Sequence, residues 1–142
     1  MTHFRQPGWT LPNGHVVRTR MEASLCDHLA SMAEPHLHGT PETHSFEVTI
    51  APRRHALFVP SIVLTDSHQG GRVVLIEPID SAQPGGGLRR LLGFRKAHLT
   101  DYFVIVVARR VLHHQLADLV LGEVADVGVR RDLGLGEDLV RS

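Results

Sequence analysis

Two apolar runs, at residues 56–64 and 72–77, are separated by a polar turn at residues 65–71 that ends in two glycines. Short runs rich in valine, isoleucine and leucine predict β-strands, and the second run, apolar on both faces, predicts a strand inside a sheet. Glu77 is the one acid within either run. Because such a strand is buried, this carboxylate has to be neutralised, paired or used.

The other elements follow from periodicity and from the positions of glycine and proline. Thr19, as an N-cap with Glu22 three residues later, begins a helix that the apolar spacing predicts over residues 20–33. Alternation of apolar and polar residues predicts a strand over residues 45–50. Further predicted elements are a helix over residues 88–99, a buried strand over residues 102–108 and a final helix over residues 111–121.

This order of elements is helix, three strands, helix, strand, helix. It predicts an α/β fold in which a mixed central sheet of four to five strands is flanked by helices. Pro60, inside the second strand, is expected at a bulge or an edge because it cannot donate a ladder hydrogen bond.

The length of 142 residues, 42% of them hydrophobic and 21% charged, predicts one soluble domain. Within it we expect an N-terminal arm at residues 1–17, a core at residues 18–122 and a tail at residues 123–142. No apolar run reaches the roughly 20 residues of a membrane span, and the N-terminus lacks a signal peptide's apolar segment. A cytoplasmic protein without membrane contact is therefore expected, and apolar residues in the tail leave a homodimer contact open.

Cysteine and charge exclude several classes of protein. The single cysteine, Cys26, excludes an internal disulfide and a zinc site with several cysteines, and its helical neighbours predict a buried thiol. Fifteen basic residues balance fifteen acidic ones, so no net charge draws the chain to nucleic acid. Nearly all of the basic residues are arginines, and many of them are adjacent in the sequence. The arginine side chain is well suited to binding phosphate. A GC-rich genome would produce the same composition.

Eleven histidines are many for this length, and three of them gather in one short segment. His36, His38 and His44 lie there together with Glu34 and Glu42, where proline and glycine prevent a helix. In an extended segment His36 and His38 point to one side, so they could ligate Zn²⁺ or Ni²⁺. A polar loop without a metal is the alternative, and the sequence leaves both open.

The element order and several local patterns resemble the restriction-endonuclease-like nucleases, the PD-(D/E)xK superfamily. Glu22 stands where that family has an acid on its first helix, and Ser61, after Pro60, stands where the family has Pro-Asp. Glu77 follows a glycine turn, as the second acid of the family does, and a basic helix and a strand come next. The resemblance covers residues 17–121.

The resemblance implies metal-dependent hydrolysis of DNA. In the family an Asp and a Glu bind Mg²⁺ or Mn²⁺, and a Lys activates the attacking water. Here Ser61 occupies the Asp position and Ile79 the Lys position. Lys96, on the following helix, is the candidate replacement for that lysine, which gives Glu77, Lys96 and Ser61 as catalytic candidates. Glu22 and Glu77 are the candidate metal ligands.

Arg89, Arg90 and Arg95, on the same predicted helix as Lys96, are the candidate DNA-binding residues. Because two of the three core catalytic positions are substituted, the resemblance equally fits an inactive descendant of an endodeoxyribonuclease. A non-catalytic DNA- or protein-binding module and a dimeric structural subunit are the alternatives. Glu77 could also be a structural acid paired with an arginine.

Overall fold

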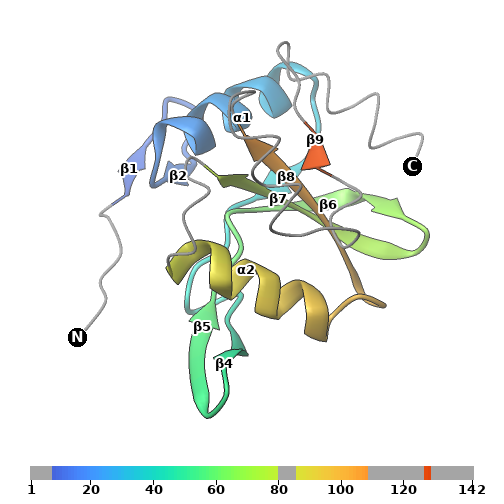
Figure 1. The fold of residues 1–142 in the computed structure, drawn as a ribbon. Helices are drawn as coiled ribbons and strands as arrows, with labels where there is room; N and C mark the ends of the chain where they lie inside the picture. Colours follow the sequence, from blue (N-terminus) through green and yellow to red (C-terminus); the bar gives the residue numbers. More distant parts are fainter. Residues whose placement is uncertain (1–7, 80–85, 109–126, 129–142) are drawn as a thin grey trace.

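The computed structural model describes residues 8–79, 86–108 and 127–128, and Figure 1 shows helices on opposite sides of a central sheet. The helices are α1 (Arg20–Ser31) and α2 (Gly86–Ala97). The strands are β1 (Trp9–Thr10), β2 (Val16–Val17), β3 (His36–Leu37), β4 (Phe46–Ala51), β5 (Arg54–Phe58), β6 (Ile62–Gln69), β7 (Arg72–Ile79), β8 (Tyr102–Ala108) and β9 (Val127–Gly128).

The main sheet has the strand order β3-β6-β7-β8-β9 and is mixed. Strands β3, β6 and β7 pair antiparallel, whereas β8 runs parallel to β7 and β9 runs parallel to β8. The parallel pair extends from Val73 opposite Tyr102 to Ile79 opposite Ala108. The predictions of a mixed α/β sheet and of an inner strand at residues 72–77 are therefore confirmed.

Side chains of β7 alternate between two apolar cores, one on each face of the sheet. Because parallel strands are stable when both faces are covered, each core has its own helix. On the α2 side lie Val48, Phe58, Val63, Leu75, Leu88, Leu91, Phe94, Val104 and Val106. On the α1 side lie Leu25, Leu29, Ile62, Leu64, Val74, Ile76, Ile105 and Val107.

The prediction of one continuous strand over residues 56–64 is wrong. The two halves of this segment belong to different sheets, because β5 pairs with β4 in a separate hairpin while β6 pairs with β7. Pro60, which lacks a backbone N–H, lies in the break between them. The turn predicted over residues 65–71 is shorter in the structure. It consists of Gly70 and Gly71, whose φ values of 58° and 81° favour glycine.

Four further predicted elements agree with the structure. The helix at residues 20–33, the strand at 45–50, the helix at 88–99 and the strand at 102–108 are confirmed within two residues at each end. The helix at residues 111–121 lies outside the described residues. In the part of the chain that the structure describes, no helix is both long and apolar enough to cross a membrane.

Gly93 allows α2 to approach β4 closely. A Cβ atom at this position would lie 2.6 Å from the backbone oxygen of Thr49 and 3.4 Å from Cβ of Val48. Because a backbone carbonyl in a paired strand cannot easily move, we predict that Gly93→Ala lowers the free energy of unfolding by about 1–3 kcal/mol. This loss is net of a gain of up to about 1 kcal/mol in helix propensity. Urea denaturation measures it, and a variant as stable as the parent would contradict the close approach.

Candidate functional site

Glu77 lies near the end of β7 with its side chain buried, at 6% relative exposure. The break between β5 and β6 places Ser61 beside it. The Ser61 backbone N–H donates to Oε2 at 2.8 Å, and the Ser61 hydroxyl donates to Oε1 at 3.1 Å. Burial raises the pKa of Glu77 to about 8, and the two hydrogen bonds oppose this only in part. The carboxyl group is therefore mostly protonated at neutral pH.

Glu22, the second predicted acid, lies in the first turn of α1 and is also buried. Its backbone N–H donates to the Thr19 hydroxyl at 3.0 Å, as the predicted N-cap requires. Its carboxylate accepts a hydrogen bond from the backbone N–H of Arg18 at 3.1 Å and contacts Nδ1 of His38 at 2.7 Å. The charge of Glu22 contributes to the raised pKa of Glu77, so the two acids lie within range of electrostatic interaction.

Lys96 lies away from these acids, exposed in the last turn of α2. The nearby ring of Phe94 is 5.2 Å from the ring of Tyr102, which pairs with Val73 at the start of β7. Glu77 is four residues further along that strand, a distance of roughly 13 Å. The structure thus brings Ser61, Glu22 and Glu77 together. It places Lys96 toward the opposite end of β7.

The two acids, as they are bonded, do not fit a Mg²⁺ or Mn²⁺ ion. Mg²⁺ requires oxygen ligands in near-octahedral geometry, and ionised carboxylates serve it best. Both oxygens of Glu77 accept hydrogen bonds from Ser61, and its raised pKa keeps the acid neutral. Both oxygens of Glu22 are engaged by Arg18 and His38. An ion would have to displace all of these interactions.

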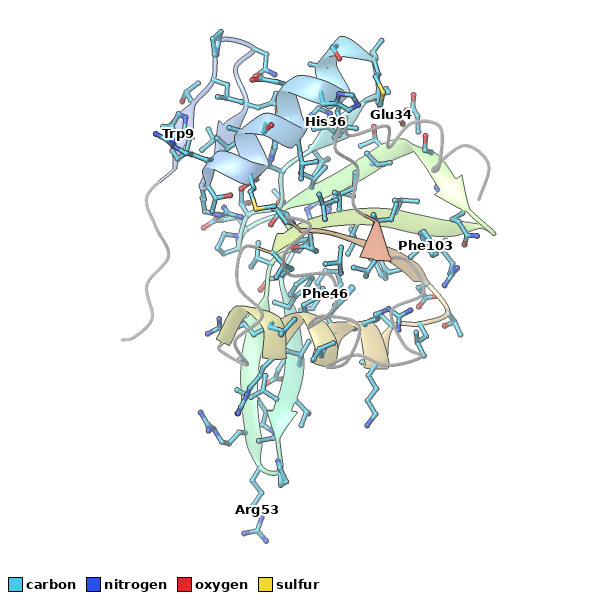
Figure 2. The ribbon with its side chains drawn as sticks, turned by 45° about the horizontal axis from the view of Figure 1, so that its top comes forward. Trp9, Glu34, His36, Phe46, Arg53 and Phe103 are labelled. Carbon is cyan, nitrogen blue, oxygen red and sulfur yellow. The ribbon has the colours of Figure 1, made fainter. Side chains whose placement is uncertain are left out.

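His38 connects Glu22 to a second group of polar side chains, which we call the His/Cys cluster. It comprises one donor atom each from His15, Cys26, His36 and His38, and these atoms all lie within 4.8 Å of one another. His15 immediately precedes β2, Cys26 is buried in α1, and His38 follows the strand β3 that contains His36. Figure 2 shows His36 beside α1. Nitrogen and sulfur donors in this arrangement could hold a transition metal.

Burial also sets the protonation of the His/Cys cluster. It lowers the pKa of His15 and of His36, and the neighbouring His38 adds to both shifts. Burial raises the pKa of the Cys26 thiol, while a hydrogen bond from the Asn13 amide at 3.5 Å acts in the opposite direction. At neutral pH the imidazoles of His15 and His36 are therefore neutral, and the Cys26 thiol is protonated when no metal is bound.

The sequence identified part of this cluster. The spacing of His36 and His38 indicates a shared ligating side, but the sequence adds His44 as their neighbour and predicts that Cys26 is a buried thiol. The structure leaves His44 outside the cluster and brings in His15 and Cys26 instead. Cys26 is indeed buried, but its sulfur faces three imidazoles. No local pattern in the sequence signals that His15 and Cys26 join the two histidines, because tertiary packing brings them together.

Comparisons with known proteins identify no relative of this chain: no protein-family model matches it, and neither curated proteins nor solved structures give a significant match. The resemblance to the PD-(D/E)xK superfamily therefore stays a prediction. Functional proposals rest on the geometry and charge of the described residues.

Proposed function

We propose that the chain is a DNA-binding module with a nuclease-like core, which binds the phosphate backbone without cleaving it. The proposed surface consists of α2 and the β4–β5 hairpin, together called the basic layer. The observation that carries the proposal is the uneven distribution of charge in a chain whose formal net charge is +0. The basic layer contains one acid, Glu47, against six Arg and Lys side chains: Arg53, Arg54, Arg89, Arg90, Arg95 and Lys96.

The basic layer is held together by aromatic packing, so its cations belong to one unit. The ring of Phe94 in α2 stacks on Phe58 at 4.5 Å and meets Phe46 edge to face at 4.9 Å. Figure 2 shows the hairpin extending from the body of the protein with Arg53 at its tip. The major groove of DNA admits a two-stranded β-ribbon of this kind. Arg54 and Arg89 are exposed in the same layer.

Binding without cleavage is supported by the bonding of the buried acids. In the family that the chain resembles, phosphodiester hydrolysis needs ionised carboxylates that bind a metal ion. Glu77 instead accepts two hydrogen bonds from Ser61 and has a pKa of about 8. Metal-dependent hydrolysis with Mg²⁺ or Mn²⁺ is the second candidate function, and the closeness of Glu22 to Glu77 favours it.

We predict that Arg54→Gln and Arg89→Gln each weaken binding to a labelled DNA duplex. Each is also expected to reduce the slope of log K against log salt by about 0.9 for every phosphate that the variant no longer neutralises. Fluorescence anisotropy between roughly 50 and 200 mM salt measures both quantities. Arg20→Gln is the matched control, because this exposed arginine begins α1 on the other face of the sheet. Equal losses in all three variants, or salt-independent binding, would contradict the proposed surface.

A cleavage assay with the purified protein distinguishes DNA binding from DNA hydrolysis. Plasmid, single-stranded and branched DNA incubated with the protein in Mg²⁺ or Mn²⁺ are expected to stay intact. Cleavage by the parent protein that is lost in Glu77→Gln would instead support the second candidate function. Cleavage that persists undiminished in the variant would exclude Glu77 from the reaction.

A further inference from the structure

Four of the six distances between the donor atoms of the His/Cys cluster are close to those of a tetrahedral zinc site, and all six are within 4.8 Å. Cys26 Sγ lies 3.4 Å from His15 Nδ1 and 3.3 Å from His36 Nε2. It lies 3.4 Å from His38 Nε2, which is itself 3.2 Å from His15 Nδ1. A tetrahedron with Zn–N bonds of about 2.05 Å and a Zn–S bond of about 2.3 Å has N···N edges of about 3.3 Å and N···S edges of about 3.6 Å. Four of the six edges therefore match a zinc tetrahedron, and the four donor atoms are close enough together to share one ion.

Hydrogen bonds outside the cluster orient two of the imidazoles toward that point. Nδ1 of His38 is 2.7 Å from the Glu22 carboxylate, and Nδ1 of His36 donates to the backbone oxygen of Glu34 at 2.9 Å. Metal-ligating histidines usually bond their second nitrogen to a carboxylate or a carbonyl in this way. The three rings are inclined to one another by 70°, 79° and 76°, so they meet edge to face and none is stacked on another.

Proton counting places two imidazole lone pairs inside the cluster. The carbonyl oxygen of Glu34 can only accept, so Nδ1 of His36 carries the proton and its Nε2 carries a lone pair. When Nδ1 of His38 donates to the Glu22 carboxylate, its Nε2 can likewise present a lone pair. The Cys26 thiol hydrogen can satisfy one of these two acceptors, and a proton on Nδ1 of His15, which is 3.2 Å from Nε2 of His38, can satisfy the other. A cation at the centre of the cluster satisfies all the donor atoms at once.

We propose that His15, Cys26, His36 and His38 bind a zinc ion and complete its coordination. One thiolate and three imidazoles suit Zn²⁺, whereas Mg²⁺ and Ca²⁺ prefer oxygen ligands. Four protein ligands leave no position for a substrate water, so the ion is structural.

The ion joins short elements to a helix that packs in the apolar core. Strands β1, β2 and β3 contain two residues each, and the ligands connect the β1–β2 hairpin and β3 to α1. This role does not depend on DNA binding by the basic layer, which lies on the other face of the sheet.

Titration of the untagged, metal-free full chain with Co²⁺ tests the proposal. We expect visible absorption bands of a tetrahedral Co²⁺ ion together with a thiolate-to-metal band, saturating at one ion per chain and lost on addition of one equivalent of Zn²⁺. Cys26→Ser and His15→Ala are expected to weaken binding at least a hundredfold. His44→Ala is the matched control, because this histidine belongs to the same segment as His36 but not to the cluster. Its affinity is expected to stay unchanged.

Two results would overturn the zinc site. One is a wild-type spectrum without the thiolate band or without saturation at one equivalent. The other is an equal loss of affinity in His44→Ala. A ligand variant that fails to fold, as judged by circular dichroism, leaves the decision to the wild-type titration, which needs no substitution.

Discussion

Removing the ion from the proposed zinc site with a chelator is expected to lower the free energy of unfolding by about 4 kcal/mol, relative to protein in free Zn²⁺ at about a thousand times the dissociation constant. The ligands come from a hairpin, a helix and a strand, so the unfolded chain does not hold them together. The free energy of metal binding therefore appears as free energy of folding. Urea denaturation at pH 7.5, with and without chelator, measures the difference.

Removal of the ion is expected to destabilise the segments around the site before the whole protein unfolds. Amide hydrogen exchange should accelerate first in the β1–β2 hairpin and around β3, whose ladders are short. The amides of β4 and β5, which pack with α2 on the opposite face of the sheet, serve as the internal control. Denaturation curves that coincide with and without chelator, in protein shown to contain the ion, would contradict a structural role.

The helices and inner strands could be predicted because their signals are local. Glu22 and Thr19 lie within one turn of α1, and the apolar residues of β7 and β8 form continuous runs. The split of the second predicted strand could not be predicted in the same way. Pro60 marks an interruption, but which sheet each half joins depends on pairing with distant strands.

The candidate sites show the same division between local and distant signals. The resemblance to the nuclease family predicts that Ser61 and Glu22 lie near Glu77. It does not predict that Ser61 donates two hydrogen bonds to the Glu77 carboxyl group. The spacing of His36 and His38 indicated shared ligands because side chains alternate along a strand. His15 and Cys26 join them through tertiary packing, which no spacing in the sequence indicates.

Glu77→Gln is expected to abolish a fall in stability that the parent protein shows between about pH 5 and pH 8. The acid has an ordinary pKa of 4.5 and a folded-state pKa of about 8, so in this window the folded protein retains a proton that the unfolded chain has lost. Stability from this group is complete below the unfolded pKa and is lost as the pH rises through the folded pKa. The loss is on the order of 3 kcal/mol across the window.

Urea denaturation at several pH values, compared between the parent and Glu77→Gln in the presence of chelator, isolates this acid. The lowered pKa values of His15 and His36 give a pH dependence of opposite sign, but they are common to both proteins and cancel in the difference. Glutamine retains an oxygen that can accept from Ser61 and does not titrate. Glu47→Gln, at an exposed acid in β4, is expected to leave the pH dependence unchanged.

Parallel curves for the parent and Glu77→Gln would mean that Glu77 is ionised in the folded protein and is paired with a cation, for which the nearby Arg18 is the available partner. An ionised Glu77 beside Glu22 is also the state that a Mg²⁺-dependent reaction requires. The pH dependence of stability therefore separates the two candidate functions without DNA or a metal. A buried neutral acid supports a binding module, and a buried carboxylate restores the case for hydrolysis.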